Sequence, residues 1–241
     1  MNILKLMIIP LIAFLLTGCL YPDSKLEKNQ MPNQAQLNTI QKAVDQYRKQ
    51  ESGLLPIKTK DQDTPIFLKY PIDFSKLQQN GLIGEAPGTA FINGGNYEYT
   101  LITPEKNPTV KLVDLRTSEA IRSLKTKVRF YQQEHKYPPF KEQIAKGVYS
   151  LDYEALGLDE PPAVDSPYSQ QMLPIYINER GKLFIDYRKD LYEYIRNKDH
   201  NYTTGDDIRY LLTDYAPFAP AYSEPYSIKN GEPIFMSQLP S

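Results

Sequence analysis

Residues 110–131 (VKLVDLRTSEAIRSLKTKVRFY) contain both kinds of element from which the chain is built. The first part, residues 110–115, is rich in β-branched and aliphatic residues that partly alternate with polar ones, which predicts a strand. The second part has apolar residues at spacings of three and four, which predicts one apolar stripe on a helix. This stripe consists of Ile121, Leu124, Val128 and Tyr131, with Ser118 just upstream as the expected N-cap.

The same pattern occurs twice and indicates an internal repeat. Leu37, Ile40, Val44 and Tyr47 have the spacings of the later stripe, with Asn33 upstream as the expected N-cap. Two further matches follow in the same order, namely residues 72–77 (IDFSKL) with 151–156 (LDYEAL) and residues 113–116 (VDLR) with 185–188 (IDYR). One match can arise by chance, but three in one order rarely do, so we infer a duplicated unit.

Strand-like segments complete each copy. Residues 97–102 and 110–115 are β-rich in the first copy, and residues 174–178 and 182–187 flank a hairpin-like turn in the second. Each unit is therefore expected to be an amphipathic helix packed on a small antiparallel sheet, an α+β fold. A unit of this size buries little core by itself, so we expect the two copies to pack together.

These patterns divide the chain into five parts. We expect a signal peptide at 1–18, a lipidated cysteine and spacer at 19–35, the first repeat at 36–116, the second at 117–190, and a C-terminal segment at 191–241. The C-terminal segment is expected to begin with helical turns and to end in an extended tail rich in Pro and Tyr. That tail either wraps the folded body or stays available to a partner.

Composition and charge limit the classes of protein that fit. The 241 residues are 41% hydrophobic and 24% charged, as in ordinary globular proteins. The formal net charge of -1 gives no basic footprint, so we expect no nucleic acid as a partner. The chain has 19 Tyr, 20 Pro and no Trp, which indicates rigid turns and aromatic packing.

The N-terminal residues have the parts of a secretory signal peptide. Lys5 supplies a positive charge, and residues 6–16 (LMIIPLIAFLL) form an uncharged run. As a helix this run covers only about half of a bilayer core of roughly 30 Å. It therefore suits the apolar region of a signal peptide better than a spanning helix.

Cys19 follows this run in a motif that resembles the bacterial lipobox. The motif consists of Leu16, Thr17, Gly18 and Cys19, and the resemblance implies that the cysteine is lipidated and becomes the first residue after cleavage. Cys19 is the only cysteine of the chain, so it has no intramolecular disulfide partner. We expect a diacylglyceryl anchor, because two acyl chains hold a membrane stably where one does not. The expected location is the extracytoplasmic face of the cell membrane.

The motifs that usually mark an enzyme are missing from the sequence. The chain has two histidines, His135 and His200, and lacks the G-x-S-x-G, P-loop and G-x-G-x-x-G signatures. We expect no cofactor and no metal, since two distant histidines make a poor ligand set. The remaining acid–base candidates are carboxylates at equivalent repeat positions: Asp73 with Asp152, and Asp114 with Asp186. Helix caps and ion pairs with Arg116 and Arg188 explain these carboxylates better than catalysis does.

Tyrosines are the best candidates for a binding surface. Those on periodic apolar faces are expected to be core residues: Tyr47, Tyr99, Tyr131 and Tyr187. The aromatic residues of the tail lie on no such face and are the candidates for partner binding: Tyr215, Phe218, Tyr222 and Tyr226. For these a peptide-like docking role and simple wrapping of the body both stay open.

Two resemblances to known families bear on the chain. Each repeat resembles the globular part of bacterial pilins and pseudopilins, with a helix ending in Tyr, a Pro-containing turn and a Tyr-rich hairpin. The whole chain resembles the YphF-like lipoproteins of Bacillus and relatives, on the motifs GCLYP, LLPI, NPTVKL, DLR and YPPFKE. This second resemblance implies a Gram-positive host and the outer face of the cytoplasmic membrane, and it implies no particular activity.

Three hypotheses about function follow, in order of preference. The first is a membrane-anchored, non-enzymatic interaction or scaffold protein of the cell envelope. The second is a lipoprotein that binds a small molecule or wall polymer in a Tyr-lined groove between the repeats. The third is a carboxylate-dependent hydrolase. The expected partners are the membrane, through the lipid, and an envelope protein or wall polymer.

Overall fold

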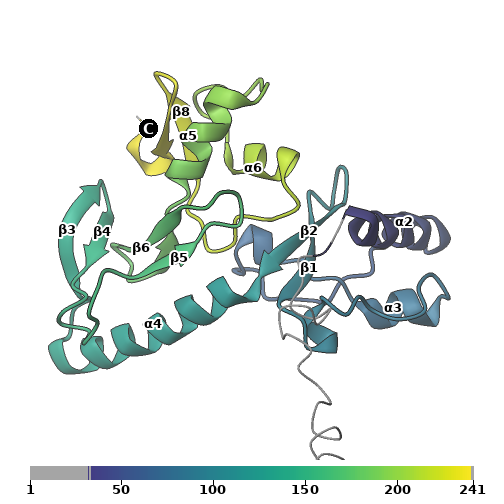
Figure 1. Ribbon diagram of the computed structural model, residues 1–241, viewed down its shortest axis with the longest axis horizontal. Helices are drawn as coiled ribbons and strands as arrows, with labels where there is room; N and C mark the ends of the chain where they lie inside the picture. Colours follow the sequence, from purple (N-terminus) through teal and green to yellow (C-terminus); the bar gives the residue numbers. More distant parts are fainter. Residues whose placement is uncertain (1–31, 33, 240–241) are drawn as a thin grey trace, which may run out of the picture.

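The strand β2 (Thr109–Asp114) runs directly into the long helix α4 (Leu115–His135), and this junction joins two α+β units. The computed structural model describes residue 32 and residues 34–239. The first unit comprises residues 34–114 and lies on the right in Figure 1, while the second comprises residues 115–239. Helix α4 extends along the lower edge of the molecule, beneath the sheet of the second unit.

The first unit packs helix α2 against a two-stranded antiparallel sheet. The elements before β2 are, in chain order, α2 (Gln34–Gln50), the 3₁₀ turn η3 (Ile66–Leu68), α3 (Phe74–Gln79), the 3₁₀ turn η4 (Phe91–Asn93) and β1 (Tyr97–Ile102). The predicted apolar stripe of α2 is buried, which confirms this helix: Leu37, Ile40, Val44 and Tyr47. Its expected N-cap, Asn33, lies outside the described residues.

Helix α4 begins earlier than the sequence suggested. Asp114 ends β2 and is the N-cap, because its Oδ1 accepts the N–H of Arg116 at 2.9 Å. Ser118 therefore lies inside the helix, and its expected role as N-cap was wrong. A carboxylate at the last strand position satisfies the free N–H groups of the first turn, so no separate linker is needed.

The second unit is built on a five-stranded sheet. Its elements after α4 are, in chain order, β3 (Phe140–Ala145), β4 (Val148–Leu151), β5 (Ala163–Asp165), β6 (Met172–Asn178), β7 (Leu183–Ile185), α5 (Arg188–Asn197), α6 (Arg209–Tyr215), β8 (Tyr226–Lys229), β9 (Glu232–Phe235) and the 3₁₀ turn η5 (Met236–Gln238). The central strand β6 pairs antiparallel with β4, β5 and β7. The hairpin between β6 and β7 confirms the predicted turn after residue 178.

The fold is α+β, as predicted, but the two units differ in their sheets. The first has two strands, whereas the second adds β3, β4 and β5 beside the β6–β7 hairpin. Helix, capped turn and hairpin nevertheless occur in the same order in both units. The duplication itself stays a prediction from the sequence.

The C-terminal segment is built into the second unit. Leu191, Ile208, Leu212, Tyr226 and Phe235 belong to the same hydrophobic core as the stripe of α4. In the second half of the expected extended tail, the strands β8 and β9 form an antiparallel hairpin. Its turn is Asn230-Gly231, with φ of 54° and 77°, the positive values that a two-residue hairpin turn requires.

The first half of the tail crosses back to the first unit. The N–H of Leu112 in β2 donates to the carbonyl of Pro217, and the carbonyl of Leu112 accepts the N–H of Ala219, both at 2.9 Å. Phe218, between these two residues, is buried in the hydrophobic core of the first unit. The tail therefore extends the two-stranded sheet by a short parallel pairing.

Tyrosines fill the junction between the units. The ring of Tyr168 lies 5.9 Å from that of Tyr187 and 6.4 Å from that of Phe218. Its hydroxyl donates to the carbonyl of Phe218 at 3.3 Å, and burial raises the pKa of Tyr168 well above its usual value. Of the tyrosines expected in the core, Tyr47, Tyr99 and Tyr187 are buried, and Tyr131 is half-buried against the ring of His135.

Phe218→Ala is expected to destabilise the protein by about 3–5 kcal/mol, because it removes a buried aromatic ring at the point where the units join. Chemical denaturation of the wild type and the variant measures this change. Phe130→Ala is the matched control, since Phe130 is 65% exposed and its loss should change stability by no more than about 0.5 kcal/mol. Equal effects of the two substitutions would contradict the prediction.

Candidate functional site

The lipobox residues lie outside the described part of the chain. They are Leu16, Thr17, Gly18 and Cys19, so the structure neither supports nor contradicts lipidation. Among the described residues, no helix is long and apolar enough to cross a membrane. The anchor therefore stays a prediction from the sequence.

The tail aromatics do not form a joint binding surface. Phe218 and Tyr226 are 5% and 0% exposed, so of the two alternatives left open by the sequence, packing against the body applies to these two residues and peptide-like docking does not. They are buried because the tail adds to β2 and to the second core instead of running over the surface. Tyr222 is half-buried, and Tyr215, at the end of α6, is 46% exposed.

Tyr215 lines an open pocket between the α5–α6 loop and helix α6, which we call the tyrosine pocket. Its volume is about 820 Å³. The residues that line it are Asp199, His200, Asn201, Tyr202, Asp206, Asp207, Tyr210, Asp214 and Tyr215. Three tyrosines and four aspartates thus face one space, although only Tyr215 had been singled out from the sequence.

Hydrogen bonds hold the tyrosine rings in place. The hydroxyl of Tyr202 donates to Oδ2 of Asp214 at 2.9 Å, and the hydroxyl of Tyr215 donates to the carbonyl of Asp199. Each bond joins the loop to α6. Fixed rings lose little entropy when a ligand is bound, which favours recognition.

The loop is also attached to the hairpin behind it. The hydroxyl of Thr204 donates to the carbonyl of Ile228 at 2.7 Å, and the N–H of Gly205 donates to the hydroxyl of Ser227 at 2.8 Å. Asp206 closes the turn by accepting the N–H and the hydroxyl of Thr203 at 2.7 and 3.0 Å. The position of the pocket therefore depends on the β8 strand as well as on the loop itself.

The tyrosine pocket is negative. The carboxylates of Asp199, Asp206 and Asp214 form no salt bridge with any described residue, whereas Asp207 pairs with Arg209 at 2.6 Å. The hydrogen bonds from Thr203 lower the pKa of Asp206, so this carboxylate stays ionised at neutral pH. Burial, and then the hydrogen bond to Asp214, raises the pKa of Tyr202, so this ring stays neutral.

One cation of the protein already lies against a ring of the pocket. The ammonium of Lys198 is 5.3 Å from the ring centroid of Tyr215 and 5.9 Å from that of Tyr194. These distances are within the range of cation–π attraction. Ionised carboxylates beside tyrosine faces are the combination that attracts ammonium and guanidinium groups.

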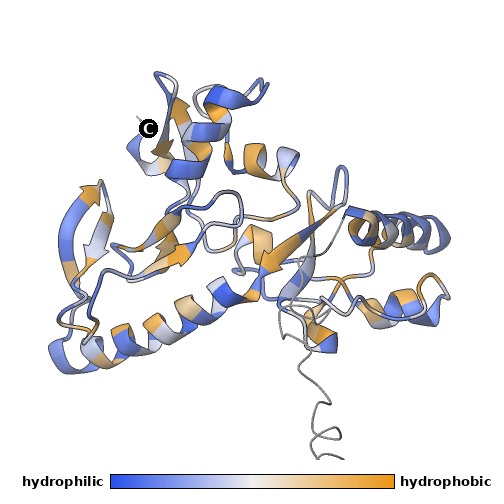
Figure 2. Ribbon diagram, viewed as in Figure 1, coloured by the Kyte–Doolittle hydropathy of each residue, from blue (hydrophilic) through white to orange (hydrophobic). Residues whose placement is uncertain are grey.

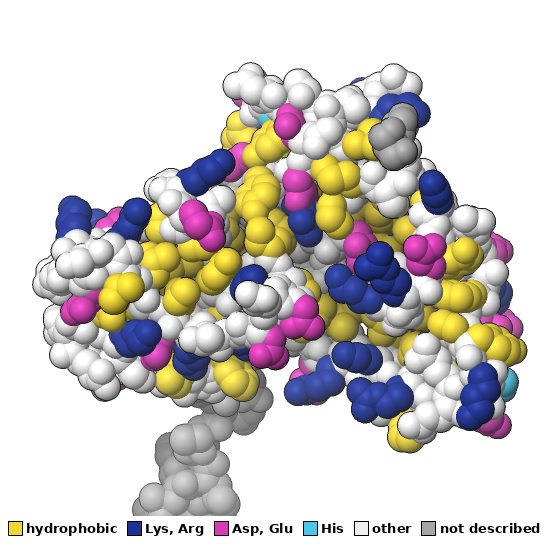
Figure 3. Space-filling model, turned by 180° about the vertical axis from the view of Figure 1, so that it is seen from behind, with side chains coloured by type: hydrophobic (Ala, Val, Ile, Leu, Met, Phe, Trp, Pro, Cys, Tyr) yellow, Lys and Arg dark blue, Asp and Glu magenta, His cyan; other side chains and the backbone are white. Residues whose placement is uncertain are grey.

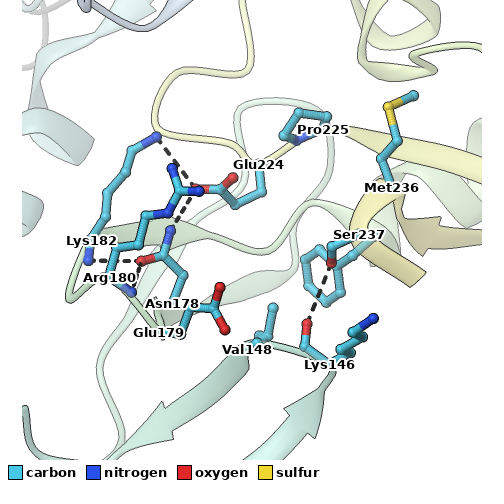
Figure 4. A pocket seen from close by; sticks show the side chains of 12 residues that line it. Lys146, Val148, Asn178, Glu179, Arg180, Lys182, Glu224, Pro225, Met236 and Ser237 are labelled. Carbon is cyan, nitrogen blue, oxygen red and sulfur yellow. Dashed lines mark hydrogen bonds and ion pairs between the residues drawn. The ribbon is translucent and has the colours of Figure 1, made fainter. Parts of the chain in front are cut away.

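A second pocket lies between the β3–β4 turn, the β6–β7 turn and the C-terminal hairpin (Figure 4). It has a volume of about 560 Å³. Its charges largely compensate each other, because Glu224 accepts from Lys182 and Asn178, both at 3.3 Å. Figure 4 shows Lys182 and Asn178 directed at this carboxylate. The pocket therefore has a weaker preference for ligand charge than the tyrosine pocket.

Each of the repeat-equivalent carboxylates makes a local structural contact. Asp73 caps α3 by accepting the N–H of Ser75 at 3.1 Å, and Asp152 accepts the N–H of Ala155 at 3.2 Å. Asp114 and Asp186 form the expected ion pairs, the latter with Arg188 at 2.7 Å.

The chain contains a third Asp-x-Arg motif, which was not predicted from the sequence. Asp207 accepts the N–H of Arg209 at 3.1 Å and pairs with its guanidinium at the start of α6. Asp114 at α4 and Asp186 at α5 make the same contacts. The identical spacing of aspartate and arginine was the available signal. Its recurrence gives three helices the same N-terminal clamp.

Asp190 is a fully buried carboxylate in the first turn of α5. Its oxygens accept hydrogen bonds from Ser166 at 2.8 Å and Ser169 at 2.6 Å, which join α5 to the loop before β6. Burial raises the pKa of Asp190 above its ordinary value of 3.8, and Glu193 adds to this, while the two serines and Lys189 oppose it. The folded state therefore holds the proton of Asp190 more tightly than the unfolded state.

Asp190→Asn is expected to remove part of the pH dependence of stability. Because the folded pKa is raised, ionised Asp190 opposes folding above that pKa, and its contribution improves as the pH falls through it. The wild type should thus gain stability relative to Asp190→Asn between about pH 7 and about pH 4. Urea denaturation at both pH values measures the difference, with Asp159→Asn as an exposed control. A difference that is constant with pH would contradict the assignment.

Comparison with known proteins gives one match. Residues 33–114 match the model of the YphF family N-terminal domain, a segment that corresponds to the described first unit apart from residue 33. Searches among curated proteins and solved structures gave no significant match. The match supports a YphF-like protein and gives no support to the pilin-like pattern. The tyrosine pocket lies beyond the matched segment.

Proposed function

We propose, starting from the YphF-family match of the first unit, that the protein is a lipid-anchored binding protein of the cell envelope. Cys19 carries the diacylglyceryl anchor on the extracytoplasmic face of the membrane, and the tyrosine pocket takes a cationic group of a partner. The partner is an envelope protein segment or a wall polymer that bears ammonium groups. No catalytic step is part of this proposal.

The observation that carries this proposal is the convergence of Tyr202, Tyr210 and Tyr215 with four aspartates on one pocket. Aromatic faces attract cations by their quadrupole, and neighbouring carboxylates strengthen that attraction. The same carboxylates repel phosphates and other anions, which argues against nucleic acid as a ligand. A cationic partner is thus the chemistry that fits.

We therefore prefer the second hypothesis from the sequence, a binding lipoprotein, to the first, a scaffold protein. A scaffold that recruits partners through its tail needs that tail exposed, but Phe218 and Tyr226 are buried. A binding protein needs a concave site with several tyrosines and polar groups, and the tyrosine pocket has both. The pocket lies on the C-terminal side of the second unit, not in the groove between repeats that was expected.

Tyr215→Ala is expected to weaken the binding of choline and of a tetralysine peptide by about 2- to 30-fold, the range of a lost cation–π contact. Tyr215→Phe should bind nearly as well as the wild type, because it keeps the ring. Calorimetric titration measures both, with Tyr192→Ala as control, since Tyr192 lies on α5 outside the pocket. Binding of both probes that is unchanged in Tyr215→Ala, or absent in the wild type, would overturn the pocket assignment.

Cys19→Ala is expected to abolish lipidation, because a thioether needs the cysteine sulfur. Metabolic labelling with a fatty-acid analogue should mark the wild type and leave the variant unlabelled. The result would refute the anchor if the wild type took up no label, or if the variant took up as much. Labelling is the preferred readout, since an uncleaved signal peptide can hold a variant on membranes without lipid.

A further inference from the structure

We propose that the outward face of α4, together with η4, rests on an anionic lipid bilayer and thereby orients the body on the membrane. We call these residues the membrane face: Phe91, Ile92, Arg122, Lys125, Arg129 and Phe130. This inference deepens the proposed function and rests on its lipid anchor. It concerns how the anchored body is held, which the anchor itself leaves open.

Helix α4 carries a line of basic side chains on its exposed side. Ile121, Leu124 and Val128 are buried against the sheet. Arg122, Lys125 and Arg129 recur at spacings of three and four, so they form a line along a different side of the helix. All three are exposed. Figure 3 shows basic side chains along the stretch of the lower edge that α4 forms.

This basic line is scarcely neutralised. Arg122 pairs with Glu119 at 3.2 Å, and both side chains are about three-quarters exposed, at 76% and 75%. Lys125 and Arg129 form no salt bridge with any described residue. The net charge of the protein is -1, so this row of cations is a local feature. A row of unpaired cations attracts an anionic partner.

Large apolar side chains lie near both ends of α4. Phe130 is 65% exposed near the C-terminal end of α4, while Phe91 and Ile92 are 66% and 52% exposed on η4. Figure 2 shows the hydrophobic residues of η4 below β1, at the same lower edge along which α4 runs. Single exposed apolar residues are normal. Apolar residues flanking a basic row are the pattern of surfaces that lie in a lipid interface.

The loop that bears Phe91 and Ile92 is fixed by a tight turn and a hydrogen bond. Gly94 caps η4 with a φ of 78°, and a Cβ on Gly95 would lie only 2.1 Å from the backbone of Thr89, so this turn requires glycine. The amide of Asn93 donates to the carbonyl of Ala86 at 2.7 Å. Two exposed apolar side chains on a fixed turn are thus presented to a partner rather than folded back.

The same loop is attached to α4. The N–H of Leu115, the first residue of α4, donates to the carbonyl of Asn96 at 2.9 Å. The apolar turn therefore keeps its position relative to the basic line. A flat bilayer can meet both at once, whereas a small soluble ligand could not span the length of the helix.

The tether favours a bilayer over a protein as the occupant. Residues 19–34 between anchor and α2 span at most about 55 Å even when fully extended. A body held so close meets the membrane at a high effective concentration, so a weak surface is sufficient. Helices α5 and α6 lie on the opposite side of the molecule from α4 (Figure 1), so the tyrosine pocket would face away from the lipid.

Single tryptophans test this membrane face directly, because the chain contains no Trp. Phe130→Trp and Ile92→Trp are made in the full-length lipidated protein and incorporated into vesicles of phosphatidylglycerol and phosphatidylcholine. We expect their emission to shift to the blue and to be quenched by lipids brominated on the acyl chain. Tyr192→Trp on α5 is the control and should show neither effect.

Charge dependence is tested on the Phe130→Trp background. The triple change Arg122→Gln, Lys125→Gln and Arg129→Gln should abolish the quenching, and so should high salt or vesicles of phosphatidylcholine alone. A matched triple change on α2 should leave the quenching intact: Lys42→Gln, Arg48→Gln and Lys49→Gln. Circular dichroism checks folding, and Arg129→Gln alone replaces the triple variant if that variant unfolds.

Flotation separates the membrane face from the anchor. If the Phe130→Trp variant floats with vesicles but its emission is no more quenched than that of Tyr192→Trp, the membrane face is overturned and the anchor stands. Protein that does not float would remove the anchor and the membrane face together. Quenching of Phe130→Trp that is equal in neutral vesicles would refute the role of the basic line. Quenching of this variant by an added envelope protein instead of by lipid would assign the face to a protein partner.

Discussion

Two backbone hydrogen bonds on Leu112 hold the molecule together. Its N–H and carbonyl pair with Pro217 and Ala219, and this pairing inserts Phe218 into the core of the first unit. A two-stranded sheet is marginal by itself. The added segment protects the edge of β2 and covers the first core with a residue that lies far along the chain. The first unit is thus completed by the C-terminal half of the protein.

The same contact positions the tyrosine pocket. Lys111, next to Leu112, extends its ammonium to the carbonyls of Thr213 and Ala216 at the end of α6. A cation at a helix C-terminus is favourable, because it meets the unpaired carbonyls and the negative end of the helix dipole. Burial lowers the pKa of Lys111, and the nearby charge of Asp214 opposes this shift. Asp214 and Tyr215, which line the pocket, are therefore held by a residue of the first unit.

The helices of the second unit share one way of starting. At α4, α5 and α6, an aspartate accepts the backbone N–H of the arginine two residues later and forms an ion pair with its guanidinium. The three clamps differ in burial, since the arginine side chain is 68% exposed at α4 but 10% exposed at α6. The exposed pair mainly caps its helix, because a solvated ion pair adds little. The buried pair also fixes the loop that forms the tyrosine pocket.

The sequence by itself determined the elements whose signals are local. The spacing of Leu37 to Tyr47 predicted α2, and the alternation in residues 97–102 and 110–115 predicted β1 and β2, because these periods report which side of an element is buried. The cap at Asp73 and the ion pairs of Asp114 and Asp186 were predicted for the same reason, since each partner lies within two residues. The Asn230-Gly231 turn and the third Asp-x-Arg clamp depend on equally local signals, so the sequence was sufficient to predict them.

Only the tertiary structure decided where the tail goes and which residues form the pocket. Tyr215, Phe218, Tyr222 and Tyr226 look alike in the sequence, yet their exposure differs because Phe218 pairs with β2 and Tyr226 enters the second core. Asp199 and Asp214 line the same pocket. The loop that places Asp199 there is bonded to Ser227 and Ile228 behind it. Contacts between residues far apart in the chain produce no periodic pattern in the sequence. The cost of closing a loop changes only slowly with its length, so such contacts require no particular spacing of residues.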